Sequence, residues 1–372
     1  MPKELTFSSA AEYDAILYGQ MTPAMAAAYL QEGKIALRTF GETLKEMYPA
    51  PDILNRLTDF FVSVTPEANS LSTLRKIRNW LSDKYQPSSR EDIFCIAFAL
   101  GLSEQQLNYL LCLCTDYGIQ YRDGREMIFT WFLRSGRSYQ QAQAFYDTLP
   151  QVPGLDRVEG REASRLTHEV YNEFLTVQTL PELYHCYCRN LSRFGTLHLR
   201  AYYYFELYLN QLIHPAPPWA AEKEPDYSVE TVIDTYLSVH IPRGRKRDGY
   251  NLVQRLVKQN WPNATSIKNI RLRKEDVPRK LLLLLYVVTE NVAIQDSPYM
   301  DMDEEPTTVD ERMEDHWWTL NALLTDCGMA PLDPRNATDW LILYAICADP
   351  DQPMSERLEQ VITHMFENVQ NT

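Results

Sequence analysis

The chain has 372 residues, and its 50 acidic and 36 basic side chains give a formal net charge of −14 at pH 7. Hydrophobic residues make up 45% of the sequence and charged residues 23%, values close to globular averages, which argues against disorder over most of the length. At roughly 100–200 residues per domain, the length predicts two to four domains. The longest apolar run, Leu281–Val288, is far shorter than the roughly 18 residues that span a bilayer, and the start of the chain has no signal-peptide pattern. We therefore expect no membrane association.

The recurrence of apolar residues at three- and four-residue spacing predicts an all-α fold, because no sustained alternation typical of strands is present. Several helix starts combine a side-chain acceptor with a carboxylate or amide three residues later, a pattern that satisfies unpaired N–H groups of a first turn. The predicted starts are Ser9/Glu12, Ser88/Glu91, Ser103/Gln106, Ser138/Gln141, Thr179/Glu182 and Thr22-Pro23.

In chain order, we predict four segments. Residues 1–68 form two or three N-terminal helices, the longest over 22–48, and residues 69–150 form a first helical repeat. Residues 151–240 form a tyrosine-rich helical block, in which three consecutive tyrosines from Tyr202 point in three directions, so at least one is exposed. Residues 241–372 form a second repeat with a basic start and an acidic insertion.

The two repeats are predicted from an internal similarity. A shift of 213 places the segment from Leu107 over the segment from Leu320 without a gap. Identical pairs are Leu107/Leu320, Asn108/Asn321, Leu110/Leu323, Leu111/Leu324, Cys114/Cys327 and Arg122/Arg335. Asp123 matches Asn336 as a helix cap, and Glu126 matches Asp339 in the first helical turn. Upstream, the pairs 74–78 with 267–271 and Arg90 with Arg279 continue the similarity at other shifts, which indicates a duplicated helical unit.

The insertion at 296–315 holds nine acidic residues and one arginine. A charge run of this kind is typical of a solvated, partly disordered loop. Metal binding by Asp301 and Asp303 is the alternative, although one close pair does not supply the six to eight oxygens that calcium prefers.

Seven cysteines, an odd number scattered through apolar stretches, indicate free thiols in a reducing compartment, so we expect a cytoplasmic location. The pairs Cys112/Cys114 and Cys186/Cys188 suggest zinc, but such pairs on helices lie on divergent faces, and structural zinc normally uses a spacer of at least two residues. We expect buried free thiols, with no metal and no cofactor. Phosphate-binding, nucleophile-elbow and metalloprotease motifs are missing from the sequence, which argues against an enzyme.

Residues 72–142 resemble Cro/C1-type (XRE-like) helix-turn-helix regulators of Firmicutes that carry a helical extension. The resemblance lies in Asn79-Trp80-Leu81 with Pro87, in Leu100–Ser103, and in the paired helices that follow. That family usually has a glycine after the recognition helix, where this chain has Asp83, so the first repeat is expected to keep the fold and lose the reading of DNA. The second repeat has the better helix-turn-helix outline at 251–274, with 262–265 as the turn.

Positive charge is concentrated in the second repeat. Residues 243–280 hold twelve basic and three acidic side chains, a net charge of +9, so the other residues carry −14 − 9 = −23. Such segregation can focus field on a phosphate backbone, because the Debye length is only about 8–10 Å. A helix over 266–274 would place Lys268, Arg271 and Lys274 near one another, with Ile267 and Ile270 facing inward.

These patterns favour a non-enzymatic, bacterial-type regulator that contacts DNA through the second repeat. Lys268, Arg271 and Arg273 would meet phosphates or base edges, and 243–247 would act as a flexible phosphate arm. The candidate residues are Arg243, Arg245, Lys246, Arg247, Lys268, Arg271, Arg273 and Lys274. The alternative is a protein-interaction scaffold, with a protein partner or self-association, in which the basic segment docks on the protein's own acidic surface.

Overall fold

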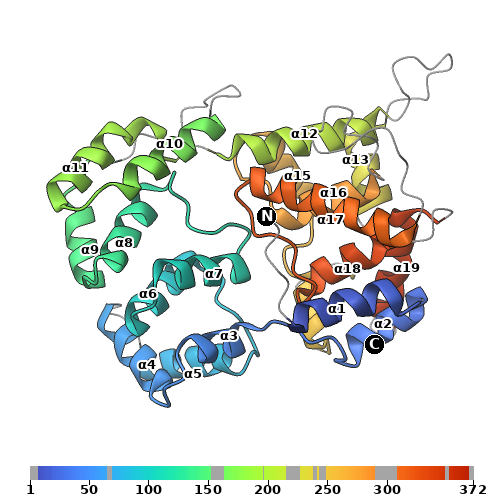
Figure 1. Ribbon diagram of the computed structural model, residues 1–372, viewed down its shortest axis with the longest axis horizontal. Coiled ribbons are helices and arrows are strands. Elements are labelled where there is room, and N and C mark those ends of the chain that lie inside the picture. The colour runs from blue at the N-terminus through green and yellow to red at the C-terminus, as the bar shows by residue number, and fades with distance from the viewer. Residues whose placement is uncertain are drawn as a thin grey trace. The chain divides into compact units, whose positions relative to one another are not determined.

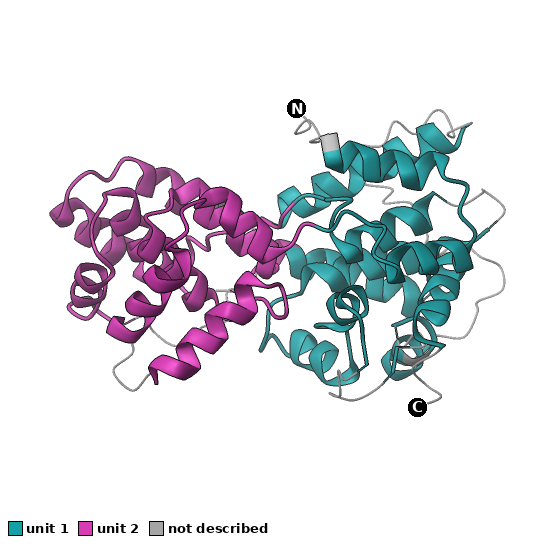
Figure 2. Ribbon diagram, turned by 90° about the horizontal axis from the view of Figure 1, so that it is seen from below, with its two compact units in different colours: residues 1–37, 201–327, 331–372 teal, residues 38–200, 328–330 magenta. Residues whose placement is uncertain are grey.

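A computed structural model describes residues 7–64, 69–151, 163–195, 197–214, 227–237, 241–242, 249–289, 308–347 and 352–367. Within these ranges the protein consists of 19 α-helices, one 3₁₀ turn (Leu191–Arg193) and one π-helical turn (Ile233–Leu237), and it contains no strand. The predicted all-α fold is confirmed (Figure 1). The chain divides into two compact units, coloured separately in Figure 2, and each unit is described by itself.

Unit 2 consists of residues 38–200 with 328–330. Its helices are α3 (Phe40–Met47), α4 (Ile53–Val64), α5 (Ser70–Leu81), α6 (Arg90–Leu100), α7 (Glu104–Cys114), α8 (Gly124–Arg134), α9 (Tyr139–Tyr146), α10 (Ala163–Leu175) and α11 (Leu180–Arg189). Helix α4 packs on α5 and α6, and α8 packs on α9. Phe94, Phe129 and Trp131 are among the large side chains fully enclosed in its core.

Unit 1 consists of residues 1–37, 201–327 and 331–372. Its helices are α1 (Phe7–Tyr18), α2 (Pro23–Gln31), α12 (Leu199–Ile213, which begins at the end of unit 2), α13 (Val229–Val232), α14 (Leu252–Lys258), α15 (Ala264–Arg271), α16 (Arg279–Val288), α17 (Val309–Asp326), α18 (Ala337–Ile346) and α19 (Met354–Phe366). Helix α19 packs on α2, so segments from both ends of the sequence lie side by side, as Figure 1 also shows. The side-chain amides of Gln31 and Gln254 both donate to the Met365 carbonyl, at 2.7 and 2.6 Å.

The division of the chain into four segments, at 1–68, 69–150, 151–240 and 241–372, stays a prediction from the sequence.

Most predicted helix starts are confirmed. Ser103, Ser138 and Thr179 form capping boxes with the residues three positions later, and Thr22 caps α2 with Pro23 at its first position. Two predicted starts are wrong. The helix expected at Ser88 begins after Ser89, and Ser9 lies inside α1, because its partner Glu12 is turned inward.

The long helix predicted over 22–48 is also wrong. Helix α2 ends at Gln31, Gly33 follows at φ 70°, and α3 begins only at Phe40. The intervening chain is held by the buried carboxylate of Glu12, which accepts the Ala36 N–H at 2.8 Å and the Tyr29 hydroxyl at 3.1 Å. This long-range contact replaces the hydrogen bonds that a continuous helix would make.

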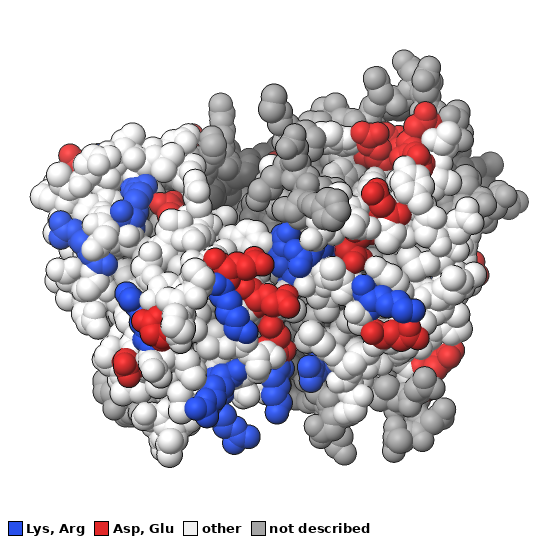
Figure 3. Space-filling model, turned by 60° about the horizontal axis from the view of Figure 1, so that its bottom comes forward, with Lys and Arg blue, Asp and Glu red and all other residues white. Residues whose placement is uncertain are grey.

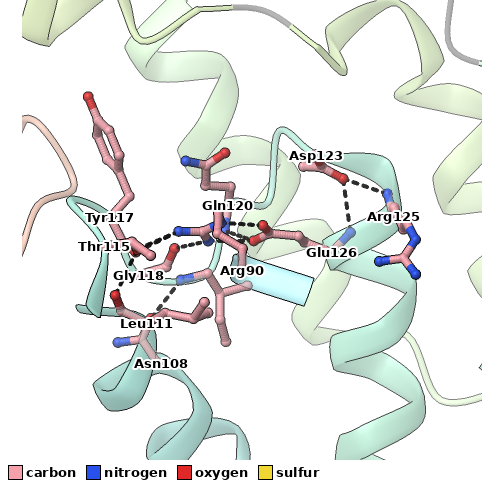
Figure 4. A network of polar contacts seen from close by, with 11 residues as sticks. Arg90, Asn108, Leu111, Thr115, Tyr117, Gly118, Gln120, Asp123, Arg125 and Glu126 are labelled. Carbon is pink, nitrogen blue, oxygen red and sulfur yellow. Dashed lines mark hydrogen bonds and ion pairs between the residues drawn. The ribbon is translucent and has the colours of Figure 1, made fainter. Parts of the chain in front are cut away.

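A polar network joins α6 to α8 in unit 2 (Figure 4). The Arg90 guanidinium donates to both oxygens of Glu126, at 2.5 and 2.7 Å, and to the carbonyls of Tyr117 and Gly118, at 2.8 and 2.6 Å. The Gln120 N–H donates to the same carboxylate at 2.9 Å. One ion pair therefore fixes two helices and the loop that precedes α8.

Several of these contacts have counterparts at the corresponding positions of unit 1. Arg279 donates to both oxygens of Asp339, at 2.6 and 2.8 Å, and to the Pro331 carbonyl at 3.1 Å. The Asp333 N–H donates to Asp339 at 2.9 Å, as Gln120 donates to Glu126. Asn108 and Asn321 each accept the N–H of the residue eleven positions later, at 2.9 and 2.8 Å. The loop and α8/α18 groups of these shared contacts correspond at the 213-residue shift, and the duplication itself stays a prediction.

Helices α5 and α15 correspond at a different shift from the one the sequence suggested. Asp83 and Arg273 both have φ 56°, and each follows the last turn of its helix. The next N–H groups, of Lys84 and Lys274, donate to the carbonyls of Asn79 and Asn269, at 3.0 and 2.9 Å. These contacts correspond at a shift of 190 residues, whereas the alignment of 74–78 with 267–271 has a shift of 193. The two shifts differ by three residues, about one helical turn, because the sequence alignment matched similar side chains and the structural one matches the positions where the two helices end.

Candidate nucleic-acid interface

The helix-turn-helix outline predicted in the second repeat is formed by α14 and α15. The connection runs over 259–263, so Ala264 and Thr265, predicted in the turn, belong to the first turn of α15. The reason is the cap: the Asn263 carboxamide oxygen accepts the N–H groups of Thr265 and Ser266, both at 3.0 Å. Trp261 anchors the connection by donating its indole N–H to the Leu237 carbonyl at 2.8 Å.

Helix α15 has a buried and an exposed side. Ile267 and Ile270 are buried, as predicted, and Lys268 and Arg271 are exposed. The helix ends at Arg271, so the predicted extent to Lys274 is wrong, and Lys274 follows the left-handed residue Arg273.

Three cations at this end of α15 are available to a ligand. Lys268, Arg271 and Lys274 are exposed, and none makes an ion pair with a described carboxylate. Arg273 differs, because its guanidinium carbon lies 3.8 Å from the ring centroid of Tyr202 and the side chain is half-buried. Burial lowers the pKa of Arg273, and the neighbouring Tyr202 and Asp276 act in the opposite direction.

Other cations of the basic segment serve the fold. Arg279 is buried in its pair with Asp339. The Lys280 ammonium donates to the carbonyls of Leu256, Val257 and Gln259, at 3.1, 2.9 and 2.5 Å, and thereby satisfies the C-terminal end of α14. The Lys258 ammonium lies 4.7 Å from the centroid of the Tyr250 ring. The net charge of +9 therefore overstates the charge that this segment presents to a partner.

Carboxylates also lie near α15. Glu275 is exposed and accepts a hydrogen bond from the Asn269 amide at 2.7 Å. The negative charges of Asp276 and Glu206 both act to raise the pKa of Arg273. The predicted arm residues Arg243, Arg245, Lys246 and Arg247 lie outside the described residues. Of the eight predicted site residues, the structure therefore describes four: Lys268, Arg271 and Lys274, which are exposed, and Arg273, which is half-buried.

The acidic insertion is described only from residue 308 onward, so Asp301 and Asp303 lie outside the described residues. Its end belongs to α17, where Thr308 forms a capping box with Glu311. Acidic side chains in a first turn interact favourably with the helix dipole, which gives Asp310 and Glu311 a structural role.

The cysteine pairs form no metal centre in the described part of the chain. Cys114 and Cys186 are buried, Cys112 and Cys188 are half-buried, and none of the four forms a disulfide bond. No group of three or more His, Cys, Asp or Glu side chains among the described residues is arranged to hold a metal ion.

The tyrosine cluster on α12 contains one exposed ring, as predicted. Tyr203 is 43% exposed, the Tyr204 hydroxyl donates to Asp326 at 3.0 Å, and Tyr208 is buried. The pairing of Tyr202 with Arg273 was not predicted, because residues 71 positions apart in sequence give no local signal.

Figure 3 shows one face of the molecule, on which Lys and Arg side chains lie in small separate groups, several beside Asp or Glu. Among the helices that the structure describes, none has the length and apolar character to cross a bilayer. No protein-family model, curated protein or solved structure matches this chain.

Proposed function

We propose that this protein is a non-enzymatic, cytoplasmic regulator of bacterial type that binds DNA through the exposed end of α15. The observation that carries the proposal is the contrast within the basic segment. Arg279 and Lys280 are engaged by the fold, whereas Lys268, Arg271 and Lys274 are exposed and make no described ion pair.

Chemical complementarity supports the phosphate backbone as the ligand. Exposed ammonium and guanidinium groups that contact phosphates release the counterions condensed on the DNA. Helices α14 and α15 form a helix-turn-helix outline, and the exposed side of α15 offers its basic side chains to such contacts.

The salt dependence gives a magnitude. Three phosphate contacts at about 0.9 per contact give a slope of about −2.7 for log K against log salt, and about a 40-fold loss of affinity between 50 and 200 mM. We would measure fluorescence anisotropy of a labelled duplex of random sequence at both salt concentrations. The absence of binding at 50 mM would refute the proposal.

The decisive variant is K268A/R271A/K274A, which should lose most of the salt slope attributed to these contacts. The control is K34A/R189A/R193A, which removes the same charge from cations that are paired with Glu32, Glu173 and Glu169. Equal effects of the two variants would show that net charge, and not this surface, governs binding.

A second candidate function is the protein-interaction scaffold. The internal use of Arg279, Lys280 and Lys258 favours it, since much of the basic segment stabilises unit 1. This candidate predicts no binding to duplex DNA at 50 mM salt. It also predicts that K268A/R271A/K274A alters self-association, which analytical ultracentrifugation would detect.

A further inference from the structure

Helix α17 of unit 1 presents a negatively charged side to the surface. Five of its 18 residues are acidic and all five are exposed, whereas its one arginine, Arg312, is half-buried. Asp310, Glu314 and Asp315 make no ion pair with a basic side chain in the part of the chain that the structure describes. Burial and the negative charges of Glu314 and Glu311 raise the pKa of Asp315. The carboxylates on this side of α17 are therefore crowded with like charge.

Two exposed aromatic rings lie among these carboxylates. Asp310, Glu314 and Trp318 are spaced four residues apart, so they follow one another along one side of the helix. Trp318 is 44% exposed, and its indole nitrogen lies 3.5 Å from the Glu314 Oε1. Tyr18 of α1 is 63% exposed and donates its hydroxyl to Asp310 at 3.3 Å. We call this surface the acidic face; it consists of Asp310, Glu314, Asp315, Trp318 and Tyr18.

The end of α15, also in unit 1, has the complementary composition. Lys268, Arg271 and Lys274 are exposed and make no ion pair with a described carboxylate, and Leu272 between them is 44% exposed. Each surface thus surrounds an exposed apolar side chain with charges opposite to those of the other. Specific protein interfaces have this composition, with an apolar anchor and complementary charges around it. Because both surfaces are exposed in the single chain, neither covers the other within one molecule.

We propose that the protein associates with itself, by contact between the end of α15 in one copy and the acidic face in a second copy. The proposal rests on the second candidate function, the interaction scaffold, and names the two surfaces that it would use. A second copy is the occupant because it supplies both the opposite charge and an apolar side chain, Leu272, for the ring of Trp318. One such contact leaves a free α15 end and a free acidic face, so further copies add unless the assembly closes on itself.

Sedimentation of the full chain in the analytical ultracentrifuge measures this association. The average mass of the wild type should rise with concentration above the 43.3 kDa of one chain. E314Q/D315N, which removes two charges of the acidic face, should weaken the association constant by about tenfold or more. Trp318→Ala should weaken it by about tenfold or more as well, because it removes the apolar anchor. The control E46Q/D59N removes two exposed carboxylates of α3 and α4 that make no described ion pair, and it should leave the association unchanged.

A mixing experiment tests the pairing of the two surfaces. K268E/R271E makes both surfaces negative and E314K/D315K makes both positive, so each variant alone should remain monomeric. An equimolar mixture should associate, because opposite charges then face each other again. The formal net charges of the variants are −14 − 4 = −18 and −14 + 4 = −10. Both molecules are negative overall, so attraction between whole molecules would not explain their association.

Three results would overturn the proposal: a monomeric wild type at every soluble concentration, association that E314Q/D315N leaves unchanged, or a mixture of folded charge-reversed variants that stays monomeric. Circular dichroism checks folding. Should a charge-reversed variant lose its helical signal, the neutral variants K268Q/R271Q and E314Q/D315N replace the pair, and their mixture should form complexes that neither forms alone. These samples contain no DNA, so failure of the DNA-binding proposal leaves the sedimentation results unchanged, and a monomeric protein leaves the anisotropy test intact.

Discussion

The buried pair of Arg279 and Asp339 gives a stringent test of the forces that hold unit 1 together. In Asp339→Asn the side chain keeps its shape, but the guanidinium of Arg279, whose side chain is only 10% exposed, loses its counter-charge. The substituted amide also has one oxygen in place of two, so it cannot accept both the Arg279 bonds and the Asp333 N–H.

The expected cost follows from these losses. Removing one partner of a buried pair costs about 3–5 kcal/mol, a large part of the 5–15 kcal/mol by which proteins are usually stable. We would measure urea unfolding of the full chain by circular dichroism at pH 7. Glu32→Gln, which removes the carboxylate of an exposed pair with Lys34, should change the free energy of unfolding by no more than about 0.5 kcal/mol.

A double-mutant cycle isolates the interaction itself. With Arg279→Gln as the second substitution, the double variant should cost about 1–3 kcal/mol less than the sum of the single variants. Additive costs, or a cost of Asp339→Asn below about 1 kcal/mol, would contradict the assignment of this pair as a principal tie between α16 and α18.

Two further predictions concern His316 and the helix caps. Burial, with a smaller contribution from Arg312, lowers the pKa of His316 to about 4, and its Nδ1 lies 2.6 Å from the Tyr286 hydroxyl. The folded state keeps this ring neutral while the unfolded state binds a proton, so stability should fall by about 3 kcal/mol as the pH drops from about 6.5 to 4. His316→Gln should flatten that part of the pH profile of unfolding, and parallel profiles would refute the reasoning. Ser103→Ala should cost about 1 kcal/mol in urea unfolding because it removes the capping box of α7, whereas Ser88→Ala, which caps no helix, should cost less than about 0.5 kcal/mol. Equal costs would contradict this assignment of caps.

The sequence predicted those features that depend on neighbouring residues. The caps at Ser103, Ser138 and Thr179, the inward isoleucines of α15 and an exposed tyrosine on α12 all follow from spacing along one helix. Their physical cause is local, because first-turn N–H groups and apolar side chains find partners within a few positions.

Features that depend on distant residues were not predictable in this way. The break after α2 depends on Glu12, and the engagement of Lys280 depends on the carbonyls at the end of α14. Counting charges along 243–280 could not distinguish cations that serve the fold from cations that remain exposed. That distinction requires knowledge of which helix ends and carboxylates pack beside each side chain.

The guanidinium of Arg90 and that of Arg279 contact main-chain carbonyls of the loops they hold, at Gly118 and Pro331. Such recognition does not depend on loop side chains, and the loop residues indeed differ, Gly-Ile-Gln at 118–120 and Pro-Leu-Asp at 331–333. Such a contact tolerates substitutions in the loop, because it requires only the arginine, the carboxylate and the same backbone conformation. Relatives of this chain would therefore be recognised by a charge-paired arginine at the start of one helix and a carboxylate in the first turn of another, long after overall identity had faded.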